Sequence, residues 1–197
     1  MRKQIRLFAA IVLVSLLGLL IITGCVAHSY YGISGLVLDS KTGKPIQGAA
    51  VVVVNYAHHS SLGGASYGAD DAIEATTDSD GKFILSKKFL WGFEPNHAYY
   101  QIYLFEPNYE FVSFDESSRA NGIYRTNGSP ILSIASTKHG MTYEFRISRL
   151  ETEGQKKENV ANVWVHENAA ITKKFQNFMK IVNTERHKYG INDVHVW

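Results

Sequence analysis

The sequence predicts a mainly β protein: a Greek-key β-sandwich of about seven strands, followed by a C-terminal α-helix. Three observations lead to this prediction. Short segments that are apolar or alternating recur between turns that contain Gly, Pro or Asp. Aromatic residues make up 12% of the chain, and its 11 Tyr and 10 Phe favour strands. Beyond residue 150 the two-residue period is replaced by apolar positions at helical spacing.

Seven segments have the length and the apolar or β-branched character of strands. They are 33–39, 49–55, 72–77, 82–85, 99–105, 110–114 and 142–149. The segment 49–55 is apolar at successive positions, which indicates a strand that is buried on both faces. The segment 142–149 alternates, with Tyr143, Phe145 and Ile147 on one face, which indicates a half-buried closing strand.

Gly, Pro and Asp residues mark the turns between these segments, and we assign structural turns to six of them. They are Gly43, Pro45, Gly48, Asp78, Asp80 and Gly81. The Asp-Gly pair predicts a tight turn that joins 72–77 to 82–85 as a hairpin. The same residues match the first half of a calcium loop, but the positions that follow offer no oxygen ligands, so the turn interpretation is favoured.

Three stretches lack a regular period. The Gly-, Ser- and His-rich stretch 56–71 predicts a long loop, the polar stretch 115–130 predicts an excursion, and the charged stretch 151–158 predicts a linker. Long loops often carry binding function, so the first of these stretches is of interest for a site.

An amphipathic helix is predicted over 169–189, capped by Asn168 and ended by Gly190. Its apolar stripe consists of Ile171, Phe175, Phe178, Met179, Val182 and Tyr189. We expect this stripe to pack on the sandwich, and a partner helix or a lipid surface is the alternative.

The N-terminus has the layout of a secretory signal. Arg2, Lys3 and Arg6 precede an uncharged apolar run over 7–22. Without these three cations, 17 of the 20 basic residues remain beside 18 acidic ones. The mature chain is therefore nearly neutral, and we expect no nucleic-acid partner, since such partners require clustered Lys and Arg.

The apolar run ends in Ile22-Thr23-Gly24-Cys25, which resembles the lipobox of bacterial lipoproteins. The resemblance implies that the signal peptidase recognises Ile22, Thr23 and Gly24, that cleavage precedes Cys25, and that the Cys25 thiol carries a diacylglycerol. An uncleaved signal anchor with an incidental cysteine is the alternative. Cys25 is the only cysteine, which favours lipidation, because disulfides need pairs.

The lipobox divides the chain into a signal peptide (1–24), a tether (25–32), a sandwich (33–150) and a region with linker and helix (151–197). The expected partner of Cys25 is a membrane, because two or three acyl chains anchor a protein stably. Val26 follows the cysteine, so the Asp of the inner-membrane retention signal of enteric bacteria is missing. We therefore expect the outer membrane, if the organism has one.

Two turn motifs resemble the carboxypeptidase regulatory-like domain. Residues 42–49 read Thr-Gly-Lys-Pro-Ile-Gln-Gly-Ala, and 77–83 read Thr-Asp-Ser-Asp-Gly-Lys-Phe. The turn Glu-Pro-Asn-Tyr at 106–109 approximates the later Lys-Pro-Gly-Tyr turn of that family, with Asn108 where Gly is usual. Asn tolerates left-handed backbone, so the change is mild. The resemblance covers about 33–114 and implies a transthyretin-like sandwich that serves as an accessory module; nothing resembles the peptidase itself.

Metal-binding residues are weakly indicated. His58 and His59 lie in the predicted loop, and imidazole with carboxylate could bind zinc or copper. The other residues that could complete such a site are Asp70, Asp71, Glu74, His97 and His139. Solvated loop histidines are the favoured interpretation, because no His-x-x-Glu-His or His-Glu-x-x-His spacing occurs.

The sequence has no Gly-rich phosphate loop. Its one Gly-x-Ser-x-Gly match, at 64–68, lies inside the predicted loop and not at the strand-to-helix turn that a nucleophile elbow requires. An aromatic surface for a glycan or peptide is a further hypothesis, against which stands a core role for the same side chains. Its residues are Trp91, Phe93, Tyr99, Tyr100, Tyr103 and Phe105. We therefore expect a non-enzymatic, cofactor-free envelope lipoprotein that binds a protein or glycan or has a structural role, with a metal-binding or hydrolytic protein using His58 and His59 as the alternative.

Overall fold

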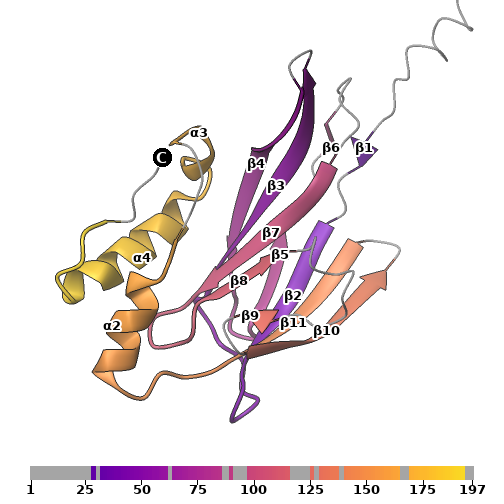
Figure 1. The fold of residues 1–197 in the computed structure, drawn as a ribbon. Helices are drawn as coiled ribbons and strands as arrows, with labels where there is room; N and C mark the ends of the chain where they lie inside the picture. Colours follow the sequence, from indigo (N-terminus) through magenta and orange to yellow (C-terminus); the bar gives the residue numbers. More distant parts are fainter. Residues whose placement is uncertain are drawn as a thin grey trace, which may run out of the picture. The chain divides into compact units, whose positions relative to one another are not determined.

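The computed structural model (Figure 1) divides the chain into two compact units. The residues that it describes are 28–29, 32–61, 64–85, 89–90, 97–115, 125–126, 129–137, 140–164 and 169–193. For several strand residues, among them His58 and His59, it describes the backbone alone. The smaller unit contains β1 (His28–Ser29) and β6 (Phe89–Leu90), which pair antiparallel. All other described elements belong to the larger unit.

The larger unit contains a sandwich of two sheets with C-terminal helices, which confirms the predicted fold class. One sheet has the strand order β5-β2-β11-β10-β9 and the other has the order β4-β3-β7-β8. The bounds are β2 (Gly32–Asp39), β3 (Ala50–Ser61), β4 (Gly64–Thr76), β5 (Lys82–Leu85), β7 (His97–Phe105), β8 (Val112–Asp115), β9 (Arg125–Thr126), β10 (Ser129–Thr137) and β11 (Gly140–Ile147). The seven predicted strands correspond to β2, β3, β4, β5, β7, β8 and β11, whereas β9 and β10 were not predicted.

The chain changes sheets between β2 and β3, between β4 and β5, between β5 and β7, and between β8 and β9, as Greek-key connections do. The predicted hairpin of β4 with β5 is therefore wrong, because β5 pairs with β2 and β4 pairs with β3. The tight turn at 78–81 instead carries the chain across to the other sheet. There the Gly81 carbonyl accepts a hydrogen bond from the Val37 amide at 2.8 Å. A Cβ at Gly81 would lie 2.5 Å from the Val37 carbonyl oxygen, so the approach depends on glycine.

A first apolar core fills the space between the two sheets. Its fully buried members include Val37, Val51, Phe83, Leu104 and Phe145. The side chains of a strand alternate between its two faces, so these positions supply the inner face of each sheet. The remaining faces of the sheets must be covered by other elements or meet solvent.

A second apolar core lies on the outer face of the β4-β3-β7-β8 sheet. Ala50, Val52 and Val54 of β3 contribute to it, so this strand is buried on both faces, as its apolar run predicts. The covering layer consists of α2 (Glu153–Ala161), α3 (Ala169–Thr172) and α4 (Gln176–Lys188), which lie on one side of that sheet (Figure 1). The predicted apolar stripe of the C-terminal helix faces this core, with Phe175, Phe178 and Val182 completely buried. The expectation that the helix packs on the sandwich is confirmed.

Two polar contacts from β4 position the helices. The Glu74 carboxylate accepts hydrogen bonds from the amides of Asn177 and Phe178, at 3.2 and 3.0 Å, and so caps the start of α4. The Asp71 carboxylate accepts one from the Lys174 ammonium at 2.5 Å. At the other end Gly190, with φ of 69°, follows the last residues of α4, as predicted.

Several segment predictions are wrong. The stretch 56–71 is a continuation of the β3–β4 ladder, which runs on to the pair Ser61–Gly64. In the stretch 115–130, the described residues 125–126 and 129–130 belong to β9 and β10, whereas 116–124 and 127–128 lie outside the described residues. The stretch 151–158 is largely α2, whose first turn has a capping box formed by Thr152 and Gln155. The predicted single helix over 169–189 is two helices, separated at 173–175. Asn168 lies outside the described residues.

Candidate functional site

The lipobox residues lie outside the part of the chain that the structure describes. This holds for Ile22, Thr23, Gly24 and Cys25. Among the described residues, no helix is long and apolar enough to cross a membrane.

The proposed metal-binding residues do not share a loop. The backbones of His58 and His59 belong to β3, opposite Tyr67 and Ser66 of β4. Asp71 and Glu74 are engaged with Lys174 and with the start of α4. Where side chains are described, no group of three or more His, Cys, Asp and Glu residues is close enough to hold a metal ion. His97 has a described backbone in β7, and His139 lies outside the described residues.

The predicted turn residues all lie in turns at one end of the sandwich strands. Gly43, Gly48 and Gly81 have φ values of 68°, 91° and 73°, and Pro45 forms a bridge with Leu38. The Asp78 carboxylate accepts hydrogen bonds from the amides of Asp80 and Lys82, at 2.9 and 2.8 Å. This oxygen organises the turn internally.

Of the four described residues of the predicted aromatic surface, three pack in or against the two cores. Tyr103 and Phe105 are buried beneath α4 and contact Phe178. Tyr100 and Tyr143 meet between the two sheets through their hydroxyls, and burial raises the pKa of the Tyr143 phenol. Trp91 and Phe93 lie outside the described residues. Tyr99 is half-buried and stacks on Tyr56, with ring centroids 4.6 Å apart.

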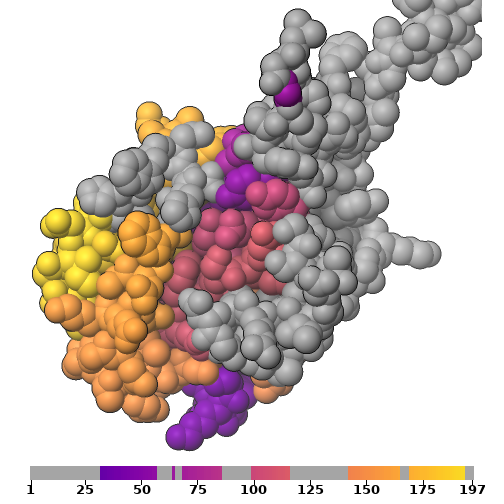
Figure 2. Space-filling model, viewed as in Figure 1, coloured from indigo at the N-terminus to yellow at the C-terminus, as the bar shows by residue number. Residues whose placement is uncertain are grey.

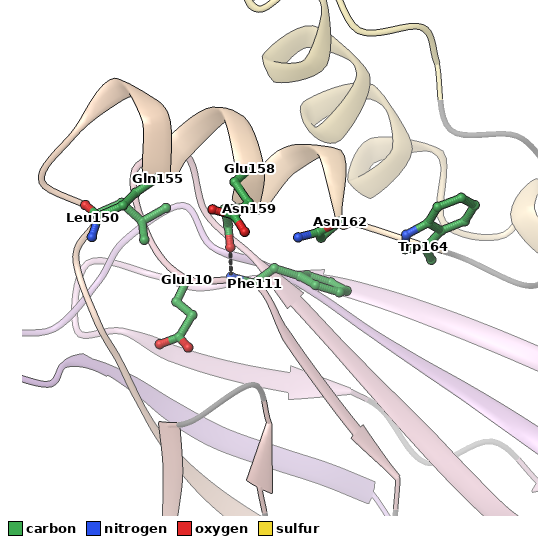
Figure 3. Close-up of a pocket in the computed structure, with 8 residues that line it drawn as sticks. All are labelled: Glu110, Phe111, Leu150, Gln155, Glu158, Asn159, Asn162 and Trp164. Atoms are coloured by element: carbon green, nitrogen blue, oxygen red, sulfur yellow. Dashed lines mark hydrogen bonds between the residues drawn. The ribbon is translucent and has the colours of Figure 1, made fainter.

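A groove beside α2 is the site that the structure offers instead (Figure 3). It has a volume of about 470 Å³. The lining residues come from the entry to β8, from the segment after β11 and from α2 with its C-terminal extension. They are Glu110, Phe111, Leu150, Gln155, Glu158, Asn159, Asn162 and Trp164. Leu150 and Gln155 lie toward one end of the groove, and Asn162 and Trp164 lie toward the other (Figure 3).

The Asn159 carboxamide fixes the geometry of the groove. Its Oδ1 accepts a hydrogen bond from the Phe111 amide at 2.8 Å, and its Nδ2 donates one to the Tyr109 carbonyl at 3.0 Å. The intervening Glu110 amide donates to the Ser148 carbonyl at 3.0 Å on the other side of the segment. The Asn159 side chain thus occupies the position where a neighbouring strand would pair. It satisfies the Phe111 amide and the Tyr109 carbonyl, the two backbone groups that face it.

The chemistry of the groove is aromatic and polar. Trp164 is 56% exposed, which is unusual for a large apolar ring. The side chains of Glu158 and Asn162 line the same groove and are exposed, so carboxylate and carboxamide groups face the solvent. None of the eight described lining residues is Lys or Arg. Sequence reasoning missed Trp164, although a lone Trp after a strongly polar stretch was the available signal.

A polar strip continues from the groove along the outer face of the same sheet. Ser113 lies two residues beyond Phe111 and accepts a hydrogen bond from the Gln101 amide nitrogen at 2.9 Å. The Gln101 carboxamide oxygen in turn accepts one from the Tyr56 hydroxyl at 3.3 Å. Tyr56 then stacks on Tyr99. In Figure 2, residues of β7 and β8 reach the surface next to the helix layer.

Comparisons with known proteins find no matching family model and no matching curated protein. Among solved structures, the chain is similar to part of the pilus adhesin RrgA from Streptococcus pneumoniae, with a TM-score of 0.33 and 16% identity over 62% of this chain. The chain covers 15% of the length of that adhesin. It is also similar to the dioxygenase domain of a dioxygenase carbohydrate-binding protein fusion from Streptomyces sp. SirexAA-E, with a TM-score of 0.35 and 14% identity over 66% of this chain and 84% of that chain.

Proposed function

We propose that this protein is a lipid-anchored, non-enzymatic binding module of the bacterial cell envelope, attached through Cys25 and built on a carboxypeptidase regulatory-like sandwich. The tether is supported by the basic N-terminus, the uncharged run over 7–22 and the small residues before a lone cysteine. Membrane attachment would hold the sandwich close to the surface polymers and proteins of the envelope.

The groove beside α2 is the single observation that carries the binding role. It combines an exposed Trp164 with exposed polar side chains on a rigid support, because α2 is tied to the sandwich by Asn159 and by the second core. Binding surfaces are typically rigid elements that present a few aromatic and polar groups.

Mass spectrometry of the native protein tests the tether. We expect the leader 1–24 to be absent and the N-terminal peptide to begin at Cys25 with the mass of a diacylglycerol added. The variant Cys25→Ala should lose the acyl mass and leave the membrane fraction. A native protein that retains its leader and carries no acyl group on Cys25 would refute the anchor.

Photo-crosslinking in living cells tests the groove. A photo-reactive amino acid placed at position 158, in the groove, is compared with the same amino acid at position 84, since Ile84 is 75% exposed on β5 of the other sheet. We expect an adduct from position 158 that is missing from position 84 and is reduced in the Cys25→Ala background. Equal labelling from both positions would contradict a binding role for the groove.

A further inference from the structure

We propose that the groove beside α2 binds an uncharged glycan, with a sugar ring stacked on Trp164 and its hydroxyls hydrogen-bonded to the neighbouring carboxamide and carboxylate groups. This inference rests on the proposed binding function and specifies the ligand class.

The stacking surface is the first argument. Trp164 is 56% exposed, at one end of an open groove. A Trp ring presents a large, rigid, weakly polar face, and it gains free energy when another apolar face covers it. The C–H face of a pyranose is such a surface, and it is flanked by hydroxyls that need polar partners.

The polar lining provides those partners. Glu158 and Asn162 are exposed at the groove, and together they offer carboxylate and carboxamide oxygens as acceptors and an NH₂ group as donor. A sugar hydroxyl both donates and accepts hydrogen bonds, so a groove that offers acceptor oxygens and an NH₂ donor can satisfy it. An apolar peptide anchor would instead favour a deep and desolvated pocket, which this open groove is not.

The charge of the groove excludes polyanions. Two of the eight lining residues are acidic, Glu110 and Glu158, and none of the eight is basic. Phosphate- or sulfate-rich polymers need Lys and Arg to neutralise them. The favoured ligand is therefore a neutral glycan.

Backbone pairing with a peptide is blocked at this place. A peptide strand that bound beside residues 109–111 would need the Phe111 amide and the Tyr109 carbonyl. Both groups are already bonded to the Asn159 side chain. A ligand here must use side-chain contacts, which is how a glycan would bind.

Titration of the full-length protein with two neutral trisaccharides tests the inference. The protein is purified from membranes in a detergent without a sugar headgroup, because a glycosidic detergent would compete for the groove. Triacetylchitotriose and cellotriose are the probes, and binding is followed by calorimetry. We expect saturable binding of at least one of them, with a Kd of about 1 mM or tighter.

Matched variants locate the binding. Trp164→Ala should weaken it about tenfold or more, and Trp164→Phe, which keeps a smaller ring, should weaken it by about threefold. Ile84→Ala is the control, since it truncates an apolar side chain on the other sheet that is even more exposed than Trp164 and should leave the affinity unchanged. Thermal unfolding of each variant, expected within about 2 °C of the wild type, establishes that the fold is intact.

Two results would overturn the glycan inference: no saturable binding of either trisaccharide up to about 10 mM, or equal affinity in wild type and Trp164→Ala. The crosslinked adduct from position 158 then shows whether the glycan inference alone has failed or the proposed binding function has failed with it. An adduct that glycosidase leaves intact, and whose tryptic crosslinked peptide contains the sequence of a second protein, identifies a protein ligand, so the glycan inference fails and the binding module stands. If position 158 yields no specific adduct in cells, both fail.

Discussion

Replacing Glu106 by Gln removes one carboxyl group from the contact between the sandwich and α4. Glu106 follows β7 and is half-buried, and Glu185 of α4 is buried with 6% of its surface exposed. Glu185 pairs with Lys188 on the same helix. Burial, and secondarily the charge of Glu185, raise the pKa of Glu106 from 4.5 to about 7.

The direction of the pH effect follows from the raised pKa. Below about pH 4.5 the Glu106 carboxyl is protonated in the folded and unfolded states alike, and its full stabilising contribution is present. Between about pH 4.5 and 7 the folded state retains a proton that the unfolded state releases, so the free energy of unfolding falls as the pH rises. Above about pH 7 the carboxylate is charged in both states, and the folded protein carries the full cost of holding it beside Glu185.

The size of this cost is limited by solvent. The shift from 4.5 to about 7 corresponds to at most about 3 kcal/mol. Because the carboxyl is only half-buried, screening reduces this to roughly 1–2 kcal/mol. Glu106→Gln keeps the shape of the side chain and removes the charge, so it should raise the Tm by about 2–8 °C at pH 8 and leave it nearly unchanged at pH 4.5.

Thermal unfolding of wild type and variant at both pH values is the assay. Glu151→Gln is the control, since it removes an exposed carboxylate before α2 and should shift the Tm equally little at both pH values. Glu185→Gln should move the pH midpoint of the effect downward without abolishing it, because burial is the larger cause. A Glu106→Gln variant whose Tm falls with pH as steeply as that of the wild type would refute the reasoning.

Three further substitutions, one of them with a matched control, test the packing. Glu74→Ala removes the cap of α4 and should lower the free energy of unfolding by about 1–2 kcal/mol in urea titrations, whereas loss of less than about 0.3 kcal/mol would show that the cap is unimportant. Gly81→Ala should cost more than about 2 kcal/mol, because its Cβ would lie 2.5 Å from the Val37 carbonyl. Gly43→Ala is its matched control, with a similar φ and open space, and should cost only about 1 kcal/mol. Phe178→Ala should cost about 3–5 kcal/mol, measured in the same way, and a cost below about 1 kcal/mol would mean that α4 is not anchored through this ring.

The sandwich could be predicted because the pattern of apolar residues within each strand indicates which of its faces is buried. In β11, Tyr143, Phe145 and Ile147 alternate with more exposed residues and point into the first core. Asn108 adopts a φ of 69° at the turn before β8, in line with the tolerance of Asn for left-handed backbone. Each of these predictions used only residues close together in the chain.

The outer half of the β3–β4 hairpin could not be predicted in this way. Residues 56–71 are rich in Gly, Ser and Ala, and they form strands because backbone groups pair across the hairpin, from Tyr56–Ala69 to Ser61–Gly64. Backbone pairing leaves no apolar period in the sequence, so the sequence alone predicts a loop for this stretch. Helix α2 was missed for a related reason: Val160 is its one buried residue, although Thr152 and Gln155 carried the capping-box signal.

The groove depends on long-range packing, and this is why the sequence did not reveal it. Asn159 lies 48 residues after Phe111 and is bonded to its amide, and no local pattern connects the two. The same hydrogen bond prevents a peptide strand from pairing with residues 109–111. It also fixes the orientation of α2, which Trp164 follows in the chain. If α2 were held by apolar contacts alone, the segment at 109–111 would keep an open amide and carbonyl, and peptide addition would be the favoured mode of binding. Because a side chain satisfies both groups, the surface retains only its aromatic and polar side chains for a ligand, and the mode of recognition follows from how the helix is attached.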